Sequence, residues 1–148
     1  MELQEDKTEI ILAQWQTCVE MANEISQRRD VMNSLFSTLN LAIVAAITFA
    51  WDIKTVTLII AGLAICVVWF VFIRNYRELN KEKFKVINEI EKMLPIKAFK
   101  DEWNAIQQNK KYKESTKLEV LLPTVFIVLY AVILIILIAV KCCGNGGN

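Results

Sequence analysis

Few residues in this sequence have the types and spacing that chemistry requires. Glu78, Glu82 and Glu89 are spaced to lie near one another on a helix face, as paired acid and base work would need. Each is followed three residues later by a lysine, which indicates a charge-paired, solvated surface instead. The sequence contains no histidine, which removes the commonest proton shuttle and metal ligand at neutral pH. No phosphate-binding loop or nucleophile–base pairing is present either, so we expect no enzyme, no cofactor and no metal.

The cysteines offer one further possibility. Cys18, Cys66, Cys142 and Cys143 fit neither a zinc site nor a disulfide framework. The adjacent pair Cys142–Cys143 is either a site of acylation or oxidation beside a membrane, or two incidental thiols.

The absence of charge marks three segments for a membrane. A helix needs about 20 apolar residues to cross the hydrocarbon core. Uncharged windows of that length occur at about 32–51, 55–73 and 120–140. The alternative, three buried helices of a soluble protein, requires more than sixty uncharged residues in a very small core and is disfavoured.

The basic residues predict the orientation. Twelve of the 17 lysines and arginines lie in 74–119, and three more lie before the first span. Only Lys54 and Lys141 fall on the other side. Since basic residues are retained in the cytoplasm, we expect a cytoplasmic N-terminus and an external or periplasmic C-terminus. The short link "DIK" at 52–54 predicts a helical hairpin, with Trp51 at the interface, and no signal peptide precedes it.

Residues 4–26 have the pattern of an amphipathic helix. An apolar stripe runs from Ile11 through Trp15 to Ile25, with acidic residues away from it. Three roles compete: packing on other cytoplasmic helices, contact between subunits, or lying in the lipid interface. The acidic polar face disfavours the last.

The second span continues without Pro or Gly into "RNYRELNKEKFKVINEIEKMLP", residues 74–95. Thr55–Leu94 is therefore predicted as one helix that Pro95 ends. Its cytoplasmic half has a heptad-like apolar seam, which predicts that another helix covers it. With two tryptophans outside the seam, the predicted oligomer interface comprises Tyr76, Leu79, Lys83, Val86, Ile87, Ile90, Met93, Trp15 and Trp103.

One face of the first span is polar. Asn33, Ser37 and Asn40 follow helical spacing, and Asn40 is expensive against lipid. These residues either hydrogen bond between helices or line a cavity or pore.

The sequence thus predicts an all-α membrane protein with three transmembrane helices, a long cytoplasmic extension of span two and an N-terminal amphipathic helix. The basic residues at 97–117 could contact anionic lipid headgroups, whereas the interspersed acidic residues argue against nucleic acid. The predicted segments are 1–30 (cytoplasmic amphipathic helix), 31–73 (hairpin), 74–118 (cytoplasmic helical region), 119–141 (third span) and 142–148 (flexible external tail).

The run from 75 to 95, followed by "FKDEW" and a third span, resembles the RipA-like family of small integral membrane proteins of bacteria. The layout is more distantly similar to SLATT proteins, proposed membrane-disrupting or pore-forming effectors. The resemblance implies an octamer in the bacterial inner membrane. The residues that carry it are Tyr76, Leu79, Asn80, Lys83, Phe84, Val86, Ile87, Glu89, Leu94, Pro95 and Trp103.

Two functions follow as hypotheses. The first is a homo-oligomeric membrane scaffold or docking complex assembled through cytoplasmic helices, with itself and membrane lipids as partners. The alternative is an oligomeric pore, channel or membrane-perturbing effector lined by the polar face of span one.

Overall fold

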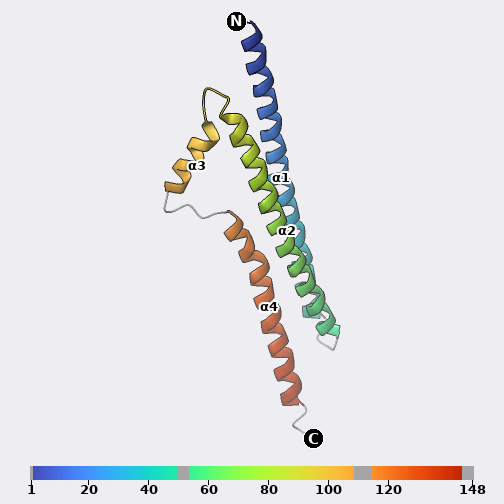
Figure 1. Ribbon diagram of the computed structural model, residues 1–148. Helices are drawn as coiled ribbons and strands as arrows, with labels where there is room; N and C mark the ends of the chain where they lie inside the picture. Colours follow the sequence, from blue (N-terminus) through green and yellow to red (C-terminus); the bar gives the residue numbers. More distant parts are fainter. Residues whose placement is uncertain (1, 50–53, 109–114, 145–148) are drawn as a thin grey trace. The chain divides into compact units, whose positions relative to one another are not determined.

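The computed structural model describes residues 2–49, 54–108 and 115–144, which form four α-helices and, within those ranges, no strand (Figure 1). Their bounds are α1 Glu2–Phe49, α2 Lys54–Glu91, α3 Ala98–Gln108 and α4 Ser115–Gly144. The predicted all-α class is confirmed. The turn predicted at 52–54, the anchor Trp51 and the basic stretch 109–113 lie partly or wholly outside the described residues.

The chain divides into two compact units. One, the amphipathic unit, comprises Met1–Asp30 and Arg74–Glu114; the other, the apolar unit, comprises Val31–Ile73 and Ser115–Asn148. Segments of α1 and α2 belong to both units, whereas α3 lies in the amphipathic unit and α4 in the apolar unit.

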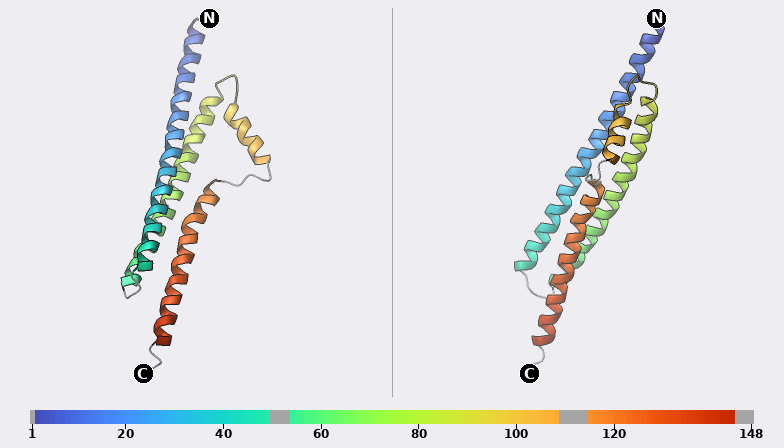
Figure 2. Two further views of the ribbon diagram at one scale, coloured as in Figure 1. Left: turned by 180° about the vertical axis from the view of Figure 1, so that it is seen from behind. Right: turned by 90° about the vertical axis from the view of Figure 1, so that its left-hand side faces the viewer.

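Three helical stretches in the described residues are long and apolar enough to cross a membrane: Asp6–Phe49, Lys54–Glu91 and Lys117–Cys142. In the apolar unit the segments of α1, α2 and α4 lie side by side (Figure 2). Leu41 and Ile135 on their outer surface are 60% and 65% exposed. A continuous apolar exterior of this kind suits lipid, because soluble proteins rarely expose large apolar patches.

The interior of the apolar unit has two clusters. Ile47, Ile59, Cys66 and Tyr130 form the first. Phe36, Trp69 and Ile73 form the second, in which the Phe36 and Trp69 rings stack with centroids 5.7 Å apart. Both clusters contain residues of α1 and α2, and the first also contains Tyr130 of α4.

At Gly62 the Tyr130 side chain of α4 lies directly against the backbone of α2. A Cβ atom added there would lie only 2.6 Å from Cε2 of Tyr130 and closer still to its Cζ and hydroxyl oxygen. Small residues at such positions let membrane helices pack tightly. The Tyr130 ring therefore occupies the space that any larger side chain at position 62 would need.

The amphipathic unit places its charges outward. The i, i+3 pairs that the sequence spacing predicts are present, with N–O distances of 3.6 Å for Lys81–Glu78 and 2.6 Å for Lys85–Glu82 and Lys92–Glu89. The hydrogen bond from Lys85, helped by the charges of Lys85 and Lys81, lowers the pKa of the Glu82 carboxyl. These side chains are more than half exposed, so this face is a solvated surface, as predicted.

Several helix boundaries differ from the predictions. The N-terminal helix and the first span are one continuous helix, because no Pro or Gly separates 26 from 32. At the other end, α2 stops at Glu91 where the sequence predicts Leu94. Met93 and Leu94 instead make turn-type bonds to the carbonyls of Ile90 and Glu91, since the residue before a proline disfavours helix.

Helix α4 extends beyond the predicted third span, whereas the apolar stretch within it that could cross a membrane is Lys117–Cys142. The prediction ends the third span at 141, whereas α4 continues to Gly144 and so includes the pair Cys142–Cys143. Cys142 is a free, exposed thiol. Only 145–148 of the predicted tail lies outside the described residues.

Candidate functional site

A polar node is buried in the apolar unit. Asn40 is 0% exposed, and its Nδ2 donates a 2.8 Å hydrogen bond to the carbonyl of Phe36 one turn earlier. Its Oδ1 accepts a 2.9 Å bond from the Tyr130 hydroxyl and a 3.4 Å bond from the Cys66 thiol. One amide side chain on α1 therefore joins α2 and α4.

A second polar contact joins α1 and α2 about two helical turns before Asn40 along α1. The indole Nε1 of Trp69 donates a 2.8 Å hydrogen bond to Oδ1 of Asn33. Trp69 is fully buried, and its ring also packs against Phe36 and Phe126. An indole N–H in an apolar setting needs such an acceptor, because an unpaired polar group there costs several kcal/mol, on the order of 2–7.

These contacts give the polar face of span one a structural use within a single chain. Asn33 and Asn40 both engage side chains of other helices, whereas Ser37 is half-buried. An amide hydrogen bonded in this way holds helices together. The lining of a pore by this face stays a prediction.

The amphipathic unit is held by an aromatic cluster. Phe99 of α3 packs against Trp15 of α1 with ring centroids 5.6 Å apart, and against Phe84 of α2 at 6.0 Å. Ala22, Ile25 and Ile87 are the buried apolar residues. The cluster fixes α3 against the other two helices.

Glu91 supplies a contact that sequence reasoning missed. It is 1% exposed, and its two carboxylate oxygens accept backbone hydrogen bonds from Phe99 at 2.8 Å and from Lys100 at 3.2 Å. These amides lie in the first turn of α3, where N–H groups lack helical partners and negative charge is favourable. The last residue of α2 therefore caps the next helix.

We predict that Glu91→Ala loosens α3. Charge-assisted hydrogen bonds contribute about 1.5–3 kcal/mol each, so amide hydrogen exchange in 98–108 should accelerate at least about tenfold. The matched control is Glu89→Ala, which removes only the exposed pair with Lys92 and should leave that exchange unchanged. Equal exchange in the two variants would contradict the capping role.

The residues predicted as an oligomer interface separate into covered and open sets. Ile87 is buried in its own chain, and Trp15, Tyr76, Lys83 and Ile90 are half-buried. The open set is Leu79, Val86, Met93 and Trp103, which are 46%, 53%, 64% and 48% exposed. Leu79 and Val86 are seven residues apart on α2, and Met93, seven residues further on, lies in the turn that follows the helix; together they form one exposed apolar stripe.

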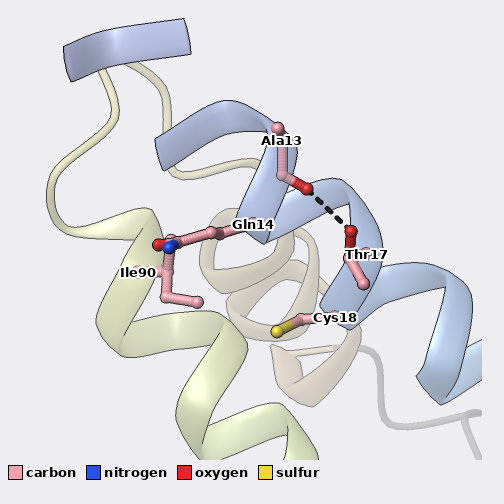
Figure 3. Close-up of a pocket in the computed structure, with 5 residues that line it drawn as sticks. All are labelled: Ala13, Gln14, Thr17, Cys18 and Ile90. Atoms are coloured by element: carbon pink, nitrogen blue, oxygen red, sulfur yellow. Dashed lines mark hydrogen bonds between the residues drawn. The ribbon is translucent and has the colours of Figure 1, made fainter. Parts of the chain in front are cut away.

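A shallow groove of about 390 Å³ lies between α1 and α2 in the same unit (Figure 3). Its lining residues are Ala13, Gln14, Thr17, Cys18 and Ile90. The Thr17 hydroxyl donates to the Ala13 carbonyl at 3.0 Å, so its hydrogen-bonding need is met within α1. The described residues contain no group of three or more His, Cys, Asp or Glu side chains that could hold a metal ion.

Together, three helices able to span a membrane, a polar node buried among them and a separate amphipathic unit define an α-helical membrane protein. The sequence model of the octameric membrane protein family (8xMP) matches residues 12–139. The chain belongs to this family, which confirms the resemblance to RipA-like octameric membrane proteins. We found no match among curated proteins or solved structures.

Proposed function

We propose that this protein is a non-enzymatic scaffold or docking complex of the bacterial inner membrane, built from copies of itself that join through the amphipathic unit. The observation that carries the proposal is the stripe Leu79, Val86 and Met93, which its own chain leaves about half exposed or more. Because the family is one of octameric membrane proteins, other copies of the chain are the natural partners to cover this stripe.

The orientation belongs to the same proposal. The amphipathic unit contains most of the basic residues and lies in the cytoplasm, whereas the C-terminal end of α4 lies outside. Its basic residues are positioned to contact anionic headgroups of the inner leaflet. The assembly then presents the charged outer face of α2 to cytoplasmic partners.

The contacts of Asn40 favour a scaffold over a pore lined by the polar face of α1. Its Oδ1 accepts from Tyr130 and Cys66, and its Nδ2 donates to the Phe36 carbonyl, all within one chain. An amide in this position stabilises the helix packing, and its carbonyl oxygen, the group that could replace the hydration of a passing cation, is already engaged by two donors.

We expect liposomes that contain the purified wild-type oligomer to show no ion flux above that of empty liposomes, measured with a K⁺-selective electrode. A flux in the wild type that is lost in Asn40→Leu, with the oligomer mass retained, would overturn the scaffold in favour of the pore. Ser37→Ala serves as the mild control on the same face, because Ser37 is only half-buried.

A further inference from the structure

The groove between α1 and α2 and the half-exposed Trp103 of α3 are two separate surfaces of the amphipathic unit. Successive helical residues are about 100° apart, so Ala13 and Thr17 point about 160° away from Trp15. Trp15 contacts Phe99 of α3. Ala13 and Thr17, two of the lining residues drawn in Figure 3, therefore lie on the side of α1 that faces away from α3, whereas Cys18 lies about 60° from Trp15.

Helix α3 is only partly covered by its own chain. Phe99, Trp103 and Ile106 share one face at i, i+4 and i+7. Phe99 packs on Trp15 and Phe84, but Trp103, one turn further on, is 48% exposed. A half-exposed tryptophan beside a packed aromatic cluster is the residue type that most often anchors a protein–protein contact.

Symmetry requires two different contact surfaces on each copy. All copies insert in the membrane with one orientation, so a two-fold axis in the membrane plane is excluded. Equivalent contacts among eight copies are then related by rotation about the membrane normal, and such a ring is heterologous: one surface of each copy meets another surface of the next. The groove and the half-exposed Trp103 are two different surfaces of each copy, as this requirement demands.

We propose that Trp103 of each copy inserts into the α1–α2 groove of the next copy around the ring. This inference rests on the proposed assembly through the amphipathic unit. Ala13, Cys18 and Ile90 give the groove apolar walls for the indole ring. Gln14 at the groove supplies an amide oxygen that can accept the indole N–H, the partner that a buried tryptophan needs.

Cys18, a free thiol in the groove, provides the test. In the full chain with Cys142→Ser and Cys143→Ser, we introduce Trp103→Cys and treat membranes with a short bis-maleimide. The inference predicts a ladder of linked chains beyond dimers, because each copy offers two different thiol positions to two neighbours. Asn104→Cys, on another face of α3, is the matched control and should give no ladder, as should Trp103→Cys combined with Cys18→Ser.

The outcomes distinguish a failure of the pairing between Trp103 and the groove from a failure of the proposed assembly through the amphipathic unit. Trp103→Ala should weaken association about thirtyfold or more, as expected for an anchor residue. Loss of the octamer in a helical, well-folded Trp103→Cys chain also supports the pairing. An intact octamer by native mass spectrometry without links from Cys18 to position 103, or dimers from Cys18 alone, would overturn the pairing and leave the assembly standing. A wild-type chain that is not oligomeric would overturn both.

Discussion

Leu79→Glu combined with Ile90→Glu should dissociate the assembly into single chains. Leu79 lies on the exposed stripe of α2 and Ile90 lines the groove, so both side chains border the surface that neighbouring copies cover. Each copy would bury two unpaired carboxylates. An unpaired charge buried at a contact costs several kcal/mol, on the order of 3–5, which multiplies to a loss of more than about a thousandfold in association.

The fold of the single chain should survive this change. Leu79 is 46% exposed and Ile90 half-buried, so neither is a core residue. The control is Lys81→Gln with Asn88→Glu, which alters the net charge by the same two units on the roughly opposite face of α2. Native mass spectrometry in mild detergent should give single chains for the first pair and wild-type mass for the second. Unchanged mass for both would refute assembly through α2.

Gly62→Ala should destabilise the apolar unit although alanine is the better helix former. Alanine gains about 1 kcal/mol of helix propensity over glycine. Against this, its Cβ would lie 2.6 Å from Cε2 of the fully buried Tyr130 ring, well inside van der Waals contact. The buried ring would have to move, and its displacement also breaks the 2.9 Å hydrogen bond to Asn40. Overpacking costs about 1–3 kcal/mol and the lost bond about 0.6–2, so the steric effect wins.

The measurement is thermal unfolding of the purified protein in detergent. A net loss of about 1–3 kcal/mol corresponds to a midpoint lowered by roughly 2–12 °C for a chain of this size. Ala61→Val enlarges the neighbouring, exposed position and should leave the midpoint nearly unchanged. In the Gly62→Ala background, Asn40→Leu should cost less than in the wild type, because the bond it removes is already broken. An unaltered midpoint in Gly62→Ala would show that α4 does not pack on α2 at this point.

The sequence was sufficient for the membrane-spanning helices because they depend on a local property. A window free of charge and about 20 residues long is visible without knowledge of any contact. The polar face of span one was visible for the same reason, since the cost of Asn40 against lipid requires a partner. The partners themselves, Tyr130 and Cys66, belong to other helices, and nothing local identifies them.

Other features needed the structure because they join distant segments. From the sequence alone, Gly62 predicts only a lower helix propensity. The structure shows that the Tyr130 ring packs against it. Glu91 looks like one more surface acid among several on α2, yet it ends the helix and caps α3. The sequence did contain a cue for this cap. Pro95 ends one helix and another helix begins a few residues later, so the first amides of the second helix need a nearby hydrogen-bond acceptor.

The seam on α2 was predicted as a single interface, and the structure divides its residues between two uses. Ile87 is covered within the chain, whereas Leu79, Val86 and Met93 remain open. Periodicity identifies an apolar face but cannot separate the part used by α1 and α3 from the part left for another copy. That separation depends on where α3 packs, which Phe99 and Glu91 determine.

Imaging of the purified oligomer by electron cryo-microscopy in a lipid nanodisc tests the central claim most directly, because it shows both the number of copies and the surfaces that join them. We expect eight copies around one axis normal to the membrane, joined by contacts between the segments 1–30 and 74–114 of neighbouring chains. Copies joined through α4 alone, with the stripe of α2 facing solvent, would contradict the account.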